Sequence, residues 1–260
     1  YISNNNNEAA VNELLHTLAS SDSTEFSIDQ RLKWIELAIN YSKLTQNQKL
    51  QEDSFMFYQC ANIQKSIYQK TKSDEFSTIL LSVPDLIQKA TELNLWDIVL
   101  QLYTISPESS IENRCIKVID AWDNLLIGYS ELSENEVSYE LNKVFSKLKP
   151  NSCSLNLSSL SPIFDDFSYS RHFSLNWVSK TLINFGISKS DIYLTYIDLL
   201  NGPLCKNLPE KRLNRLIYNA LWTLTQGNQC DYSLISKFVD TILSNENNPL
   251  YNETKELVSY

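Results

Sequence analysis

The sequence predicts an all-α fold, an irregular α-solenoid of stacked antiparallel helix pairs with about a dozen helices. Three observations lead to this prediction. The chain of 260 residues has only four Gly and seven Pro, where average usage would give roughly 18 and 13. Apolar residues recur at helical spacing along the whole chain, and no segment alternates as a strand does. The even spread of these stripes favours stacked pairs over a compact helical bundle, which is the alternative architecture.

The first half of the chain is expected to hold seven helices after a disordered lead-in over residues 1–7. Ser133 and Glu136 have the spacing of a capping box, in which two reciprocal side-chain bonds start a helix. Pro84 suits a first helical turn, because its missing N–H would be unpaired there anyway. The apolar periodicity predicts helices over residues 8–19, 27–44, 51–72, 84–92, 95–103, 110–130 and 133–148.

The second half begins with residues 151–161, which are dominated by Ser and Asn and predict a flexible link. The link would subdivide a solenoid segment that covers residues 8–260. A short segment from Pro162 then leads to helices over residues 175–185, 188–201, 209–226 and 232–244, and to a last helix from Pro249. Three glycines follow predicted helix ends (Gly186, Gly202 and Gly227), and Gly128 inside a helix is expected to mark a bend or a close helix contact.

Composition excludes several classes of function. The four glycines are isolated, so the chain has no loop that could cradle a phosphate. Lys and Arg number 22 against 31 Asp and Glu, a net charge of −9 that opposes general nucleic-acid binding. No apolar run reaches the roughly 18 residues of a membrane-spanning helix. The five cysteines are far apart and odd in number, which indicates reduced thiols in a cytosolic or nuclear protein.

No catalytic, cofactor-binding or metal-binding set is apparent. His16 and His172 are far apart and lack the closely spaced partner ligands of a zinc site; His172 is expected at a helix start or on the surface. Asp165 and Asp166 resemble the paired aspartates that bind magnesium and a diphosphate in helical enzymes, but Tyr169 stands where a third carboxylate is needed. Two acids near a helix start, favoured by the helix dipole, are the simpler interpretation.

The basic residues gather in one dense cluster, which we interpret as a solvated helix face, with a small anionic or nucleic-acid patch as the alternative. The cluster comprises Lys206, Lys211, Arg212 and Arg215, and the same interpretation applies to Lys143, Lys147 and Lys149. The tryptophans all fall in apolar helix stripes and are expected to anchor the core, while an exposed aromatic groove for a partner's segment is the functional alternative. They are Trp34, Trp96, Trp122, Trp177 and Trp222.

Several blocks of sequence occur in an order that has a counterpart in a known family. The blocks are Arg31-Leu32-Lys33-Trp34-Ile35 with Ala38, Ala61-Asn62-Ile63-Gln64 through Ile67-Tyr68-Gln69, Leu95-Trp96-Asp97, Trp122-Asp123-Asn124-Leu125-Leu126, Leu175-Asn176-Trp177, Asn184-Phe185-Gly186-Ile187 and Tyr196-Ile197-Asp198-Leu199-Leu200. In this order they resemble the C-terminal helical region of the large non-repetitive scaffold nucleoporins of the nuclear pore inner ring. The resemblance rests on order and spacing, since no block is a chemical motif.

The resemblance implies a non-enzymatic architectural α-solenoid without a cofactor, located at the nuclear pore complex of the nuclear envelope and supporting nucleocytoplasmic transport of protein and mRNA. Its implied partners are linker-nucleoporin segments and other inner-ring scaffold proteins, with no small-molecule substrate, nucleic acid or membrane contact. It identifies no partner-binding residues. Two alternatives remain from the residues: another interaction solenoid, such as a transport-receptor or vesicle-coat module, and an all-α metal-dependent enzyme centred on Asp165 and Asp166.

Overall fold

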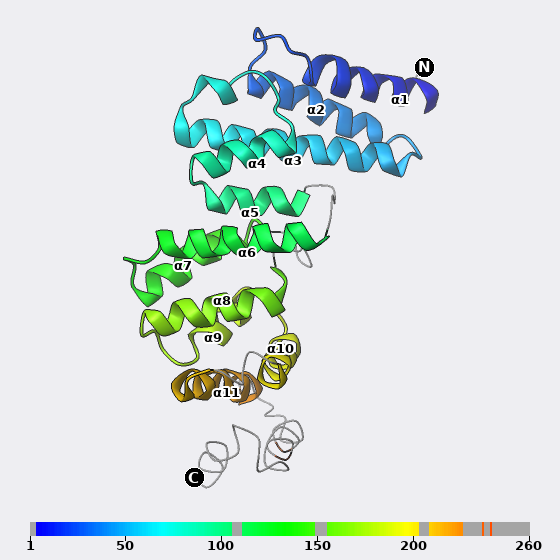
Figure 1. Cartoon of the computed structure of the whole chain (residues 1–260). Coiled ribbons are helices and arrows are strands. Elements are labelled where there is room, and N and C mark those ends of the chain that lie inside the picture. Colours follow the sequence, from blue (N-terminus) through cyan, green and yellow to red (C-terminus); the bar gives the residue numbers. More distant parts are fainter. Residues whose placement is uncertain are drawn as a thin grey trace. The chain divides into compact units, whose positions relative to one another are not determined.

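The computed structural model describes residues 4–105, 111–148, 155–202 and 208–225, together with Ser236 and Asp240. Within these ranges the chain forms eleven α-helices, one π-helical segment and one 3-10 turn, and it contains no strand (Figure 1). The chain divides into two compact units, Tyr1–Ala121 and Trp122–Tyr260. No helix within these described ranges is long and apolar enough to cross a membrane.

The first unit consists of short-linked helices that pack on their neighbours in sequence. They are α1 (Asn4–Asn12), the π-helix η1 (Glu13–Ala19), α2 (Ile28–Ser42), α3 (Gln48–Thr71), the 3-10 turn η2 (Asp74–Phe76), α4 (Val83–Glu92), α5 (Trp96–Ile105) and the first part of α6 (Ile111–Gly128). Helix α2 packs against α1, η1 and α3, and α4 pairs with α5. The core of η1, α2 and α3 is aliphatic and includes Leu15, Ile35 and Ala61.

Two buried polar side chains hold loops of the first unit onto its helices. Arg31 of α2 is fully buried, and its guanidinium donates to the carbonyl oxygen of Ala19 at 2.6 Å, which ties the end of η1 to α2. The Gln64 amide of α3 donates to the Ile79 carbonyl at 2.5 Å and accepts from the Leu81 N–H at 2.8 Å. Both residues belong to the ordered sequence blocks, so these blocks contribute loop attachment as well as core packing.

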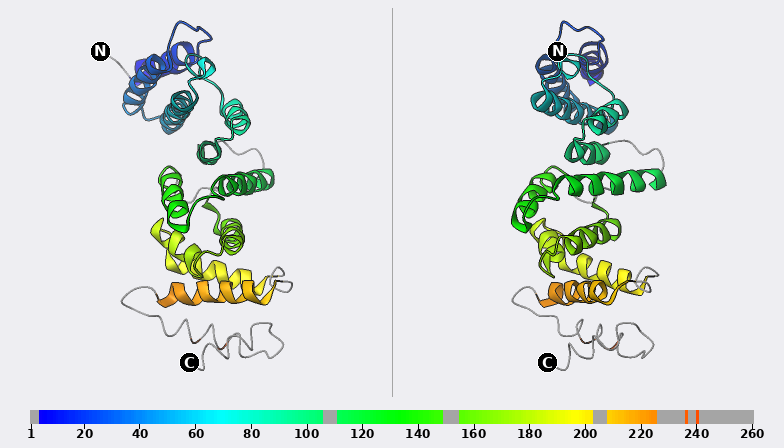
Figure 2. Two further views of the ribbon diagram at one scale, coloured as in Figure 1. Left: turned by 90° about the vertical axis from the view of Figure 1, so that its left-hand side faces the viewer. Right: turned by 60° about the vertical axis from the view of Figure 1, so that its left-hand side comes forward.

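The second unit continues the helical pairing. Its helices are the remainder of α6, α7 (Glu134–Phe145), α8 (Leu157–Ser170), α9 (Trp177–Asn184), α10 (Lys189–Asn201) and α11 (Glu210–Thr225). Helix α10 packs along α11 and also contacts α8, and α9 contacts both α8 and α11 (Figure 2). Aromatic rings fill the core: Phe164 lies with its ring centroid 5.5 Å from that of Trp122 and 5.9 Å from that of Trp177.

The predicted fold class is confirmed: the described chain is all-α, and in each unit consecutive helices pack as stacked pairs, as in an α-solenoid. The Ser133–Glu136 capping box is present, Ser188 caps α10, and Pro84 lies in the first turn of α4. Helix α1 begins at Asn4, so four of the seven lead-in residues are helical. The helices predicted over 232–244 and from Pro249, and Gly227, lie outside the described ranges.

One expected link is a helix instead. Helix α8 begins at Leu157 and contains Pro162, so the prediction of a flexible link up to residue 161 and a short segment after it is wrong. Asn156 caps the helix by accepting from the Ser158 N–H at 3.1 Å. Pro162 is the sixth helical residue, past the first turn, so its missing N–H removes one backbone hydrogen bond from the helix. Polar residues of this segment, which resemble those of a link in the sequence, lie on the buried face of the helix; Ser161 and Asp165 are examples.

Glycine is required at one helix end and dispensable at another. Gly186 has φ +83° and closes α9 with a Schellman motif, in which Gly186 and Ile187 donate to the Ile183 and Leu182 carbonyls. Gly128 is the last residue of α6, and an added Cβ would meet nothing within 4 Å among the described atoms. The expected close helix contact at Gly128 is therefore wrong.

Substitution of the two glycines by alanine should have opposite effects. Gly186→Ala is expected to lower the free energy of unfolding by about 1 kcal/mol, because an L side chain is strained at that positive φ. Gly128→Ala is expected to leave stability unchanged or raise it by about 0.5 kcal/mol, because alanine restricts the unfolded chain. Urea denaturation of both variants checks the pair, and equal effects would contradict the assigned conformations.

Candidate functional site

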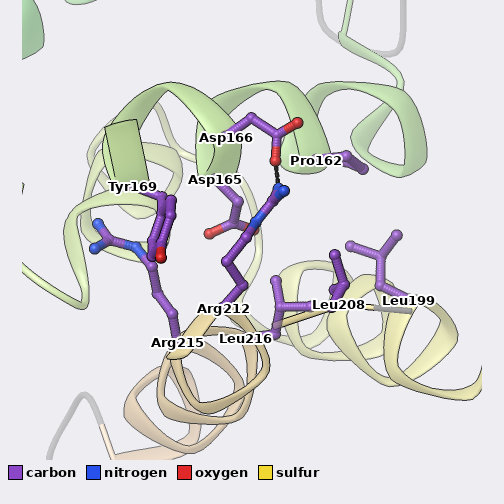
Figure 3. Close-up of a pocket in the computed structure, with 9 residues that line it drawn as sticks. All are labelled: Pro162, Asp165, Asp166, Tyr169, Leu199, Leu208, Arg212, Arg215 and Leu216. Atoms are coloured by element: carbon purple, nitrogen blue, oxygen red, sulfur yellow. Dashed lines mark ion pairs between the residues drawn. The ribbon is translucent and has the colours of Figure 1, made fainter. Parts of the chain in front are cut away.

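The second unit contains a cavity of about 210 Å³ between α8, α10 and α11 (Figure 3). Helix α8 contributes four residues spaced three, one and three apart, which places them on one helix face. The walls of the cavity combine apolar side chains with two carboxylates and two guanidinium groups. The lining residues are Pro162, Asp165, Asp166, Tyr169, Leu199, Leu208, Arg212, Arg215 and Leu216.

Asp165 is the buried acid of this cavity. Its side chain is only 4% exposed, and among the described residues neither carboxylate oxygen has a well-formed hydrogen bond. The buried Tyr196 hydroxyl of α10 faces this carboxylate as its hydrogen-bond donor, with loose geometry, and favours its charged form. Asp165 is the ninth of the fourteen residues of α8, so the interpretation of Asp165 and Asp166 as acids at a helix start is wrong.

Asp166 lies beside Asp165 but has a different environment. Its carboxylate is exposed and pairs with the Arg212 guanidinium of α11, as the dashed line in Figure 3 marks. Arg212 is half-buried and lies over the Tyr169 ring, with its guanidinium carbon 5.7 Å from the ring centroid. Asp166, Arg212 and Tyr169 therefore form a connected rim that joins α8 to α11.

Arg215 lies one turn further along α11 and is buried, at 5% exposed. Its guanidinium donates to the carbonyl oxygens of Phe173 at 3.1 Å and Ser174 at 2.8 Å, which fixes the loop before α9. The interpretation of the basic cluster as a solvated helix face is therefore wrong for Arg215, and Arg212 is engaged in an ion pair. Lys206 lies outside the described residues. Lys143 is exposed and pairs with Glu140, as a solvated face implies.

Burial controls the electrostatics of the cavity. Desolvation raises the pKa of Asp165 from 3.8 to about 7, and the Tyr196 hydroxyl, Arg215 and Arg212 oppose this rise without cancelling it. Burial also lowers the pKa of Arg215, against the pull of Asp165. The pKa of Tyr196 is raised by burial and by the neighbouring carboxylate. The surroundings of Asp165 therefore offset only part of the cost of burying its charged form.

The raised pKa of Asp165 predicts a pH dependence of stability. Because the folded state holds the proton more tightly than the unfolded state, whose pKa is about 3.9, the contribution of Asp165 falls as pH rises from 4 to 7. Relative to Asp165→Asn, which cannot ionise, the wild type should lose about 2.5 kcal/mol of unfolding free energy between pH 5 and pH 8. Urea denaturation across this range measures the difference. Asp198→Asn, an exposed change on α10, is the control, and parallel profiles for Asp165→Asn and the wild type would contradict the raised pKa.

The other candidate residues that the structure describes lie apart from one another. Within the described ranges, no three His, Cys, Asp or Glu side chains gather closely enough to hold a metal ion. His172 is exposed and follows the end of α8 with φ 56°, while His16 packs edge-on against Phe57. Burial raises the pKa of the Cys60 thiol to about 11, which makes it a weak nucleophile.

Of the five tryptophans, Trp122 and Trp177 are core anchors as predicted, and the other three are half-buried. Sequence reasoning named the acids and arginines of the cavity but did not bring them together. It did not identify the apolar walls Leu199, Leu208 and Leu216. Recognising α8 as a helix would have placed its four cavity residues on one face.

No family model matches the chain, and no curated protein matches it. Solved structures of Nup170 fragments from Chaetomium thermophilum are similar in fold. The SOL fragment matches with a TM-score of 0.68 at 13% identity, over 96% of this chain and 40% of that one. The C-terminal domain matches with a TM-score of 0.68 at 13% identity, over 97% and 60%. The C-terminal domain in complex with Nup145N matches with a TM-score of 0.65 at 13% identity, over 96% and 59%.

These matches establish a likeness of fold with helical nucleoporin domains. The chain spans between 40% and 60% of the length of these three solved fragments. At 13% identity the likeness supports the all-α solenoid class and carries no residue role across.

Proposed function

We propose that this chain is a scaffold segment of the inner ring of the nuclear pore complex, which binds other nucleoporins through its stacked helices and supports nucleocytoplasmic transport of protein and mRNA. The observation that carries the proposal is the fold likeness to Nup170 fragments, which covers 96% to 98% of the chain. The ordered sequence blocks support it independently, because they resemble the same family.

The partner is proposed to be a short segment of a linker nucleoporin. One of the similar structures is a complex of the Nup170 C-terminal domain with Nup145N, so an equivalent segment from this protein's own organism is the first to test. The role is architectural rather than catalytic. The buried polar side chains are consistent with this role, because Arg31, Gln64 and Arg215 each bind loop carbonyls.

Two measurements test the proposal. The endogenous protein, tagged with a fluorescent protein, is expected at the nuclear rim in a punctate pattern. The purified chain is expected to retain linker-nucleoporin segments in a pull-down, while an unrelated α-solenoid of similar net charge does not. A diffuse cytoplasmic signal together with no retained segment would contradict the proposal, and a signal on coated vesicles would favour a vesicle-coat module instead.

A further inference from the structure

A series of hydrogen bonds links successive helix pairs of the second unit at a nearly constant sequence spacing. Among the described residues of this unit, nine hydrogen bonds join residues that lie 39 to 44 positions apart. They connect the N-terminal half of α7 and the corner before it to the loop before α9 and the start of α9, and these in turn to the middle of α11. We call these nine bonds the polar ladder.

The first bonds of the polar ladder run from α7 to the next helix pair. Ser174 donates to the Glu134 carboxylate twice, from its backbone N–H at 2.8 Å and from its hydroxyl. The Trp177 indole N–H donates to the Ser138 hydroxyl at 2.9 Å. Arg171 donates to a carbonyl of the corner before α7 at 3.3 Å. Together these bonds fix the distance between α7 and the start of α9.

The second bonds of the polar ladder run from α9 and its loop to α11. Asn219 accepts from the Ser179 N–H at 3.2 Å and donates to the Leu175 carbonyl at 2.8 Å. Arg215 donates to two carbonyls of the same loop. Because Arg215, Asn219 and Ser179 are buried, no water can replace these bonds when they stretch, and breaking one leaves a buried polar group unsatisfied.

The other helix of each pair, α6, α8 or α10, meets its neighbours through less directional contacts. The ring of Phe164 on α8 packs against that of Trp122 on α6. Between α8 and α10, the Tyr196 hydroxyl faces Asp165 with loose geometry only. The cavity of about 210 Å³ also lies between α8, α10 and α11. This row of helices therefore has both weakly directional contacts and room to move.

We propose that the polar ladder is the stiff edge of the second unit, about which the unit bends. The distances between α7, α9 and α11 stay fixed, while α6, α8 and α10 shift relative to one another and the cavity changes in volume. A stack of helix pairs that contact only their neighbours bends by small rotations between the pairs. The polar ladder selects the direction of these rotations, a conformational property that goes beyond the scaffold function proposed above.

The geometry of the contacts explains why the two rows differ. An N–H···O hydrogen bond weakens steeply as its angle closes or as the donor–acceptor distance grows beyond about 3.2 Å. Apolar contacts are non-directional, so side chains can slide on one another while they remain buried. Protein interiors are otherwise closely packed, and the cavity is the place where a small displacement of α8 against α10 meets the least resistance. Bending about the polar ladder keeps the directional bonds intact.

Double electron–electron resonance on the 260-residue chain can measure the two rows separately. Spin labels are attached to a ketone-bearing amino acid, which leaves the five native cysteines untouched. Labels at Tyr139 of α7 and Tyr218 of α11 form the ladder pair, and labels at Ile127 of α6 and Leu194 of α10 form the open pair. All four positions are exposed. The distance distribution of the open pair is expected to be about two-fold wider than that of the ladder pair.

Two variants should change the two widths in opposite directions. Glu134→Ala removes two bonds of the polar ladder at a half-exposed position, and it is expected to widen the ladder pair by about 1.5-fold. Glu140→Ala lies on the same helix, where Glu140 pairs with Lys143, and is the control that should leave both widths unchanged. Leu199→Phe fills part of the cavity and is expected to narrow the open pair by about 1.5-fold.

Hydrogen exchange gives a second readout of the same bonds. The Ser174 N–H is expected to exchange at least about ten-fold faster in Glu134→Ala than in Glu140→Ala, because its acceptor has been removed. Circular dichroism checks that each variant is folded. If Glu134→Ala does not fold, Trp177→Phe takes its place, since it removes the donor to Ser138 and keeps an aromatic ring.

Equal widths of the two pairs in the chain without further substitution, or a wider ladder pair, would overturn the inference. A ladder pair that is unchanged in Glu134→Ala would show that these bonds do not stiffen the edge. An open pair that is unchanged in Leu199→Phe would show that the cavity does not take up the movement. None of these results depends on whether the chain retains linker nucleoporins, so the proposed function stands or fails separately.

Discussion

The Phe164→Ala variant is expected to lose about 3–5 kcal/mol of unfolding free energy, the cost of removing a buried aromatic side chain and leaving a cavity. Phe164 of α8 is fully buried. Its ring centroid lies 5.5 Å from that of Trp122, 6.3 Å from that of Phe145 and 5.9 Å from that of Trp177. Because these rings come from α6, α7 and α9, the change removes contacts on three sides of the second unit.

Equilibrium denaturation followed by tryptophan fluorescence measures this loss. Tyr139→Ala is the matched control, since this aromatic ring on α7 is 62% exposed and its truncation should cost less than about 0.5 kcal/mol. If Phe164→Ala and Tyr139→Ala had the same small effect, the aromatic core described for the second unit would be incorrect.

Arg215→Met is expected to lose about 3–4 kcal/mol at pH 8, the cost of breaking a buried charged interaction. Two loop carbonyls, of Phe173 and Ser174, lose their donor, and Asp165 loses one of the cations that oppose the rise of its pKa. The pKa of Asp165 then rises further. At pH 5 Asp165 is protonated in both proteins, so the loss should shrink to about 2 kcal/mol from the unpaired carbonyls.

Arg212→Met is the matched control, because it removes one guanidinium from the same face of α11 as Arg215→Met does. Arg212 pairs with the exposed Asp166, and exposed ion pairs contribute only about 0–1 kcal/mol. Urea denaturation of both variants at pH 5 and pH 8 gives four differences. A loss for Arg215→Met that is independent of pH would separate Arg215 from Asp165 and contradict the electrostatic coupling.

Helix formation could be predicted from the sequence wherever apolar residues alone occupied the buried face. Helix α8 is the exception. Its buried face includes Ser161, Asp165 and Ser168 beside Leu160 and Phe164, and it contains Pro162, so its composition is typical of a link. Burial of those polar groups depends on neighbouring helices, and no local pattern carries that information.

The candidate site was predictable in its residue types but not in its assembly. Asp165 and Arg215 are fifty positions apart and meet only because α11 packs near α8 and α10 in the second unit. Helix α11 has a buried polar stripe beside its apolar one, formed by residues four positions apart: Arg215, Asn219 and Thr223. This polar stripe binds the backbone of the loop before α9: the Asn219 amide donates to the Leu175 carbonyl at 2.8 Å.

The position of the unit boundary inside α6 matters for dissecting the protein. Separate expression of the two units as fragments would require cleavage between Ala121 and Trp122, in the middle of a continuous helix. Such a cut would break the i to i−4 backbone bonds across it and leave new helix ends without caps. It would also place Trp122, whose ring packs on Phe145 and Phe164, at a fraying terminus. Fragments that both retain the whole of α6 are therefore the ones expected to fold.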